Sequence, residues 1–318
     1  MRASRLALVA SLVLVAASSW RCGEKDPEPA PVADAGVVDA GVPDAGLVDA
    51  GHPFPPTETF FGLWGSAPDD YWAGAENGLL YHWDGASWTW VDSGTDVALT
   101  GVWGSSRDDV WMAGAKGTLL HWDGSELSSV ESGVQSALVC VTGTSASDVW
   151  VTGGNGTILH WDGSAWSRSE SGTSVELAGC FARAPDDAWA VGLDGKILRF
   201  DGQAWQSIVS GTGAWLSDVW AAGPDDVWVV GNGSLLLHWD GTSFSEVPSN
   251  TTVQLSAIWG FASNDVRAVG NEGVIMKWNG TKWARAYSPV RVTLTNIFGT
   301  SADDYWLAGA KGTLKQMP

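Results

Sequence analysis

Four histidines stand at positions where imidazole could do chemistry. His82, His121, His160 and His238 each open a His-Trp-Asp-Gly sequence, and they recur at multiples of 39 residues. Imidazole binds metals and exchanges protons near neutral pH. Because the four share one position of a repeat, however, they fall on separate units of the fold and cannot converge on one site. We therefore interpret them as strand residues with packing or capping roles, and we expect no catalytic histidine, no metal and no cofactor.

Two series of aspartates follow the same period. Catalytic carboxylates normally act singly or as one pair, whereas a carboxylate in a turn accepts hydrogen bonds from nearby backbone N–H groups. We interpret both series as turn formers on one face of the fold, and we nominate no catalytic residue. The first series is Asp70, Asp109, Asp148, Asp187, Asp226, Asp265 and Asp304, and the second is Asp84, Asp123, Asp162, Asp201 and Asp240.

The elements that carry these residues are short strands. In residues 99–137, the apolar segment around Val102 predicts a first strand, residues 110–113 a second, residues 118–122 a third, and Asp123-Gly124 a hairpin turn to a fourth. Helical periodicity is absent, and four short strands per unit of about 40 residues are typical of a β-propeller. Seven copies of the first strand predict an all-β, seven-bladed β-propeller of four-stranded repeats over residues 57–318.

The seventh repeat stops after its third strand, near Leu314. Its fourth strand is either missing or supplied by the segment before Phe60. Residues 54–58 are a poor strand because two of them, Pro55 and Pro56, cannot donate a ladder hydrogen bond. We therefore expect an incomplete last blade.

Residues that break the repeat are the candidates for binding, because the scaffold does not require them. Trp72 and its equivalents are expected to pack between blades, which leaves Arg267 as the exception at that position. The connections from fourth to first strands vary most, and they lie on the face opposite the Asp turns. Trp215, in one of them, either stacks on a sugar or peptide or covers the core. The nominated ligand-binding residues are Trp215, Arg267, Thr95, Asp96 and Gln135.

The N-terminus has the pattern of an export signal over residues 1–21. A basic start precedes an apolar run over residues 6–17, which is too short to span a bilayer. Cys22 follows where bacterial lipoproteins carry their lipidated cysteine, although Ser19-Trp20-Arg21 departs from that motif. We predict a lipid anchor at Cys22 and an outer-membrane or cell-surface location. The alternative is ordinary cleavage near Ser18 or Ser19, which leaves a free exposed thiol on a periplasmic or secreted protein.

Residues 22–56 form an acidic spacer. Asp-Ala-Gly recurs every five residues from Asp34 to Asp49, and bulky aromatic residues are absent until Phe54. Such a segment buries too little apolar surface to offset its ordering entropy, so we expect a disordered linker that holds the folded domain off a membrane. The net charge of −19 repels phosphate backbones, and we therefore expect no nucleic-acid partner.

The repeat resembles two kinds of propeller. Asp-Gly followed by Trp between third and fourth strands, as at Asp162-Gly163 and Trp166, looks like the Asp-box of sialidase-type (BNR) propellers, although the Asp-box has a residue between Asp and Gly. The succession of Val-Trp-Gly, Asp-Asp-Val-Trp and His-Trp-Asp-Gly, together with the Asp-Ala-Gly linker, is similar to Trp-rich propeller lipoproteins of myxobacteria. This resemblance implies export and a propeller, and it implies no activity.

Two further residue sets limit the chemistry. Cys140 and Cys180 fall one position out of register on the first strands of adjacent blades. Because neighbouring strand residues point to opposite sides, we expect these two cysteines to be unbonded. A sialidase needs an arginine cluster, but the arginines here occupy different repeat positions, so we expect no such cluster and disfavour glycosidase activity. They are Arg107, Arg168, Arg183 and Arg199.

The sequence thus predicts an exported, monomeric, non-catalytic module that binds a protein, a peptide or a glycan. One alternative is a hydrolase or lyase with a site in the central channel, which would need at least two ionisable groups within hydrogen-bonding reach of each other. Another is a structural component of the cell envelope.

Overall fold

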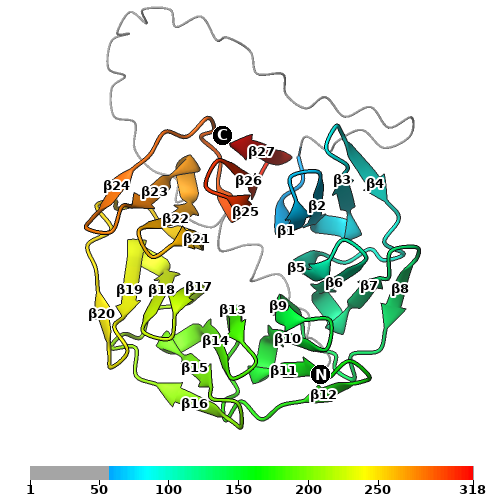
Figure 1. The fold of residues 1–318 in the computed structure, drawn as a ribbon, viewed down its shortest axis with the longest axis horizontal. Coiled ribbons are helices and arrows are strands. Elements are labelled where there is room, and N and C mark those ends of the chain that lie inside the picture. The colour runs from blue at the N-terminus through cyan, green and yellow to red at the C-terminus, as the bar shows by residue number, and fades with distance from the viewer. Residues whose placement is uncertain (1–56, 318) are drawn as a thin grey trace, which may run out of the picture. The chain divides into compact units, whose positions relative to one another are not determined.

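The computed structural model describes residues 57–317, which form a β-propeller of seven blades (Figure 1). The predicted signal peptide, Cys22 and the Asp-Ala-Gly linker lie outside the described residues, as do Phe54, Pro55 and Pro56. No α-helix occurs within residues 57–317, and no helix there is long and apolar enough to cross a membrane. The predicted fold class is confirmed.

Each blade is an antiparallel sheet whose strands follow one another in sequence order from the centre to the rim. The first strands lie innermost, and we use the word channel for the axis that their backbones surround (Figure 1). They are β1 (Phe60–Ala67), β5 (Leu99–Ser106), β9 (Leu138–Ser145), β13 (Leu177–Ala184), β17 (Leu216–Gly223), β21 (Leu255–Ala262) and β25 (Leu294–Ser301). The second strands are β2 (Asp70–Ala75), β6 (Asp109–Gly114), β10 (Asp148–Gly153), β14 (Asp187–Gly192), β18 (Asp226–Gly231), β22 (Asp265–Gly270) and β26 (Asp304–Gly309).

The outer strands are shorter. The third strands are β3 (Leu80–Trp83), β7 (Leu119–Trp122), β11 (Ile158–Trp161), β15 (Ile197–Phe200), β19 (Leu235–Trp239), β23 (Ile275–Trp278) and β27 (Thr313–Met317). The fourth strands are β4 (Trp88–Val91), β8 (Leu127–Val130), β12 (Trp166–Arg168), β16 (Trp205–Ile208), β20 (Phe244–Glu246) and β24 (Trp283–Arg285).

The two faces of the propeller carry different turns. The first-to-second turns and the third-to-fourth hairpins share one face, which we call the Asp face. A Cβ on Gly124 (φ 89°), for example, would lie 2.8 Å from the Cβ of Asp108 in the neighbouring turn, so only glycine fits this hairpin. The opposite face, which we call the connection face, carries the fourth-to-first connections and six short 3-10 turns. These are η1 (Glu76–Gly78), η2 (Ala115–Gly117), η3 (Gly154–Gly156), η4 (Leu193–Gly195), η5 (Asn232–Ser234) and η6 (Asn271–Gly273).

Tryptophans on the second strands join the blades. Trp111 stacks on His121 of its own blade with ring centroids 4.1 Å apart, and its ring lies 5.2 Å from Trp161 and 5.0 Å from Trp166 of the next blade. Trp306 closes the ring by contacting Trp83 of the first blade at 5.1 Å. The predicted packing between blades is therefore confirmed for this position. Its members are Trp72, Trp111, Trp150, Trp189, Trp228 and Trp306.

The last blade has three strands, as predicted. Leu314 on its edge strand β27 is partly exposed, whereas the six equivalent residues are fully buried beneath a fourth strand. The Gly312 N–H donates to the carbonyl oxygen of Glu58 at 2.8 Å, just as the Gly195 N–H donates to Ala214 in a complete blade. The chain entering the first blade therefore follows the path of a regular fourth-to-first connection.

Arg267 is explained by this incomplete blade. In five other blades the second-strand Trp packs on aromatic residues from both the third and the fourth strand of its neighbour, but here the neighbour offers Met317 and no fourth strand. Arg267 is buried, at 7% exposure. Its guanidinium carbon lies 4.3 Å from the ring centre of Tyr305 and 4.8 Å from that of Phe261. The cation therefore replaces an indole that would lack aromatic partners.

Cys140 and Cys180 form a disulfide between β9 and β13, so the prediction that they are unbonded was wrong. Their Cα atoms are 5.8 Å apart. The first strands of neighbouring blades are staggered by one residue relative to the 39-residue period. The same 40-residue offset joins the Ala182 N–H to the Thr142 hydroxyl and the Ile258 N–H to the Asp218 carboxylate, both at 2.9 Å. A cysteine pair 40 residues apart therefore faces across the blade boundary.

Two substitutions toward the repeat consensus should have opposite effects on stability. Leu127→Trp restores the usual fourth-strand aromatic beside Trp72 and should raise the free energy of unfolding by about 0.5–1.5 kcal/mol. Arg267→Trp should lower it by about 1–3 kcal/mol, because the indole loses the two ring contacts of the guanidinium and finds no fourth strand to pack against. Denaturant unfolding of both variants measures this, and stabilisation by Arg267→Trp would contradict our account of the last blade.

Candidate functional site

The Asp face is built from self-contained side-chain networks. The Asp109 carboxylate lies 2.6 Å from His121 Nε2 and accepts the Ser105 hydroxyl, while His121 stacks on Trp111. Burial alone would raise the pKa of Asp109, but the hydrogen bonds from His121 and Ser105 hold it below its usual range. Equivalent pairs are His82–Asp70, His160–Asp148 and His238–Asp226.

This network corrects one detail of the sequence interpretation. The first aspartate series was expected to accept backbone N–H groups, but these carboxylates accept side-chain donors from the neighbouring strands instead. The second series behaves as predicted. Asp123 accepts the backbone N–H groups of Ser125 and Glu126, each at 2.8 Å, and the Ser125 hydroxyl at 2.7 Å. The Ser125 hydroxyl and these N–H groups lower the pKa of Asp123 to about 2.

The fourth blade brings together two arginines that were expected to lie apart. Arg183 Nε and Arg199 Nε lie 2.6 Å and 2.9 Å from the two carboxylate oxygens of the buried Asp187. Arg199 also lies over the Trp189 ring, in the place that histidine takes in other blades. The expectation of no convergence was wrong because Arg183 and Arg199 replace the Ser and His of the repeated network. Both guanidinium groups are committed to Asp187, so they do not form an open anion site.

The nominated residues of the connection face lie in different sectors. Thr95 and Gln135 line a shallow hollow of about 500 Å³ together with Lys116. The Thr95 hydroxyl accepts the Val97 N–H at 3.4 Å, a turn contact that recurs in other connections. Asp96 is exposed at the tip of the same connection, with a carboxylate oxygen 4.0 Å from the Lys116 ammonium. These residues lie around the first and second blades, away from Trp215.

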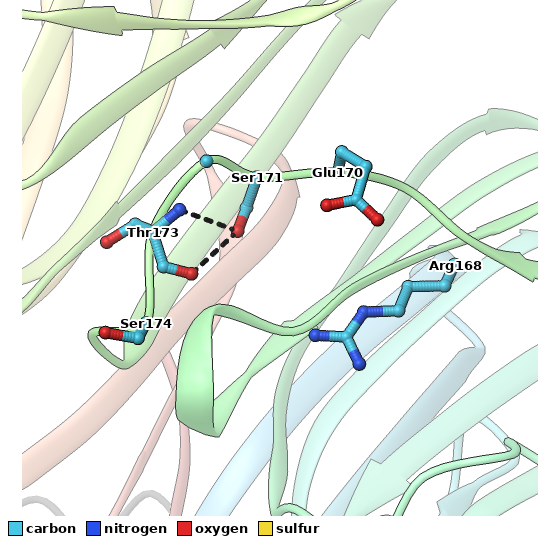
Figure 2. Close-up of a pocket in the computed structure, with 6 residues that line it drawn as sticks. Arg168, Glu170, Ser171, Thr173 and Ser174 are labelled. Carbon is cyan, nitrogen blue, oxygen red and sulfur yellow. Dashed lines mark hydrogen bonds between the residues drawn. The ribbon is translucent and has the colours of Figure 1, made fainter.

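A second hollow of about 510 Å³ is formed by the connection after β12 (Figure 2). Arg168 and Glu170 lie on one side of it. The Ser171 hydroxyl donates to the carbonyl oxygens of Gly156 at 2.7 Å and Thr173 at 3.2 Å, and it accepts the Thr173 N–H. The Ser171 hydroxyl and the Thr173 backbone are therefore paired with each other and with η3. Both hollows are by-products of the repeated Ser-Gly turn.

Trp215 is the nominated residue that stands nearest the channel. It directly precedes β17, on the connection into the fifth blade, and it is partly exposed. Leu216 is fully buried in the blade, whereas Trp215 keeps part of its surface exposed although its indole Nε1 is buried without a hydrogen-bond partner among the described residues. The neighbouring blades carry Glu176 and Gln254 at the same repeat position. Our sequence analysis did not nominate these two residues, although a comparison of that position in all seven repeats would have revealed them.

The channel wall holds one carboxylate on the described first strands. Asp218 on β17 accepts the N–H groups of Val219 and of Ile258 on the next blade, each at 2.9 Å. The side chain is only partly exposed, and this desolvation raises the pKa of Asp218 to about 7 despite the two N–H donors. Its counterparts on the other first strands include Gly, Ala, Cys and Asn, so the carboxylate is a singular feature of the channel.

Arg267, in contrast, lies inside the boundary between the sixth and seventh blades and away from the other nominated residues. Its Nη2 donates to the carbonyl oxygen of Ala302 at 3.1 Å. Within residues 57–317, no three His, Cys, Asp or Glu side chains gather in a group that could hold a metal ion. Of the nominated residues, Trp215 is therefore the one that directly precedes a first strand, whereas the others lie in outer turns or inside a blade boundary.

Comparisons with known proteins show the fold. No protein-family model and no curated protein matches the sequence. Similar solved structures include YCF48 bound to D1 peptide, at 17% identity and a TM-score of 0.68 over 82% of this chain and 93% of that one. YCF48 from Cyanidioschyzon merolae matches at 18% identity and a TM-score of 0.67, over 82% and 96%. The WD40 propeller domain of Doa1 matches at 10% identity and a TM-score of 0.70, over 81% of this chain and 92% of that one.

At these identities the likeness shows the fold alone. The chain shares the architecture of seven-bladed propellers of the YCF48 and WD40 type. The resemblance to Asp-box propellers and to myxobacterial lipoproteins stays a prediction.

Asp218 should make stability fall as pH rises. Its folded-state pKa of about 7 exceeds the ordinary aspartate pKa of 3.8, so the folded protein is favoured when Asp218 is protonated. This contribution is complete below about pH 4 and is lost as the pH approaches and passes 7. Relative to Asp218→Asn, the wild-type free energy of unfolding should therefore drop by roughly 2–4 kcal/mol between pH 4 and 8. Chemical denaturation of the two proteins measures this, and the prediction is wrong if their free energies of unfolding depend on pH in the same way.

Proposed function

We propose that this protein is a non-catalytic interaction module that binds a peptide or protein segment on its connection face. The observation that carries the proposal is the difference between the two faces. The networks of the Asp face recur from blade to blade with their polar groups paired internally. The residues that depart from the repeat without serving the scaffold lie at the channel mouth of the connection face, where Trp215 is the largest.

The ionisable groups favour binding over catalysis. Glycoside hydrolysis uses two carboxylates that flank the scissile bond. Asp218 is the only carboxylate on the described first strands, and both of its oxygens accept backbone N–H groups. The paired Asp and His residues of the Asp face, which are the other candidates for acid–base work, repeat on four blades beneath stacked tryptophans. A hydrolase or lyase activity therefore receives no support from this arrangement.

One of the similar solved structures supports peptide binding by example. One of the similar structures is YCF48 bound to D1 peptide, so a propeller of this architecture holds a peptide in that case. A propeller suits this task because its rigid blades display short connections around one concave centre. For the present chain, a peptide rather than a glycan is the ligand that we favour.

We also propose that the protein is exported and anchored through Cys22. The Cys140–Cys180 disulfide supports export, because disulfides persist in oxidising compartments. The acidic linker would then hold the propeller away from the membrane.

Mass spectrometry of the protein from membrane fractions should show a mature chain that begins at an acylated Cys22. A thiol assay on the denatured, non-reduced protein should find Cys140 and Cys180 unreactive. A mature chain without acyl groups would refute the anchor, and reactive thiols at both positions would remove the support for export.

Peptide binding can be tested with a displayed library of random peptides selected against the full chain. Selected peptides should bind at micromolar affinity, and Trp215→Ala should weaken them about tenfold, as expected for loss of a stacking aromatic residue. Glu126→Ala, on an exposed hairpin of the Asp face, is the matched control and should leave affinity unchanged. Failure to select any peptide, or equal losses in both variants, would refute the proposal.

A further inference from the structure

A ring of seven residues surrounds the channel mouth on the connection face. Each residue directly precedes a first strand, and in every blade its carbonyl oxygen accepts the N–H of the residue that opens the second-to-third turn. The backbone of the ring is therefore uniform, and only the side chains differ. The ring is Thr59, Ala98, Ala137, Glu176, Trp215, Gln254 and Thr293.

The large side chains of this ring are consecutive. Glu176, Trp215 and Gln254 enter the fourth, fifth and sixth blades, whereas the other members are Thr or Ala. The packing of the blades does not require this difference, because Ala serves equally well in the first connections. The mouth is therefore asymmetric, with a carboxylate, an indole and an amide at equivalent positions of three consecutive blades.

The Glu176 carboxyl is not compensated within the protein. It is partly buried, and it has no hydrogen bond or ion pair to any of residues 57–317. Partial burial raises the pKa of Glu176, because the carboxylate loses some of its contact with water and gains no partner among the described residues. The nearby charge at the start of the 3-10 turn is Asp194, a second acid, beside the exposed Leu193. A cation from outside the chain would remove this cost.

Unpartnered polar atoms gather at the same arc. Ser217 Oγ, two residues after Trp215, and Asn232 Oδ1 are buried without a hydrogen-bond partner among the described residues. The Asn232 N–H donates to the carbonyl oxygen of Trp215 at 2.9 Å, which places this residue against the indole-bearing segment. Buried polar atoms are normally paired, and unpaired ones often mark a site for water or a ligand. Both atoms lie outside the fourth-to-first connections, on β17 and in η5, and the serine hydroxyl groups of the connections themselves are paired within their turns.

We propose that Glu176, Trp215 and Gln254 receive a lysine or arginine side chain of the bound peptide segment. The cation would pair with the Glu176 carboxylate and lie on the Trp215 ring, while the Gln254 amide oxygen accepts one of its N–H groups. A neutral sugar could stack on Trp215 but would leave Glu176 uncompensated. The net charge of −19 adds a long-range attraction for a basic segment. This inference rests on the proposed function and names the chemistry of its ligand.

The test uses the full chain and synthetic copies of peptides selected from the random library. The selected sequences should share a required Lys or Arg, and its replacement by norleucine should weaken binding about tenfold. Glu176→Gln should cause a similar loss of affinity. Binding of the norleucine peptide to Glu176→Gln should be little weaker than binding with either change alone. Glu176→Lys should recover binding of the peptide in which the basic residue is replaced by Glu.

Glu170→Gln is the matched control, because Glu170 is an exposed carboxylate on the rim of the same face and tests general acidity. The affinity of Glu170→Gln for the peptides should stay within about twofold of the wild-type affinity, because solvent and salt screen an exposed surface charge. Peptides that bind without a required basic residue, or with equal affinity to Glu176→Gln, would overturn the cation site and leave the interaction module standing. A library that yields no peptide would refute the module itself, and a bound neutral glycan lost in Trp215→Ala would overturn the cation site.

Discussion

The packing of one tryptophan per blade against the next blade is the interaction on which this fold depends. A short four-stranded sheet cannot bury its own faces, so each blade is stable only between two neighbours. The second-strand indoles fill that space by contacting aromatic residues of the next blade, as Trp228 does with Trp278 at 4.9 Å and Trp283 at 5.3 Å. The histidines, which first looked catalytic, stack on the other side of these indoles and are held by the first aspartate series.

The same constraint explains where the repeat is broken. Once the last blade ends at β27, the sixth blade has no aromatic pair to meet, and a buried arginine between two rings takes the position of the indole. The break in the fourth blade is of another kind, because Arg183 and Arg199 keep the Asp187 network intact with different donors. Both departures thus preserve the packing or the hydrogen bonds of the scaffold. They differ from the channel-mouth residues, for which the scaffold offers no reason.

A division of labour between the faces follows from this. The Asp face uses its charged groups to hold turns and strands, so little of its chemistry is available to a ligand. The connection face repeats its backbone as faithfully as the Asp face does, yet it leaves the side chains before the first strands free to vary. Glu176, Trp215 and Gln254 occupy positions where the same backbone hydrogen bond fixes the chain in every blade, whatever the side chain. Such positions are suited to recognition because the scaffold does not change when they do.

The sequence by itself determined the propeller, its seven blades, the strand order and the incomplete last blade, because each repeat encodes its own turns and apolar strands locally. It also identified Trp215 as an exception. Only the tertiary structure decided that Cys140 meets Cys180, that Arg183 and Arg199 share Asp187, and that Glu176 and Gln254 flank Trp215. The disulfide depends on the one-residue stagger between the first strands of neighbouring repeats. The Asp187 contacts instead depend on the pairing of three strands within one blade. A period of 39 residues fixes equivalence between blades, but the twist that packs one blade on another fixes which residues touch.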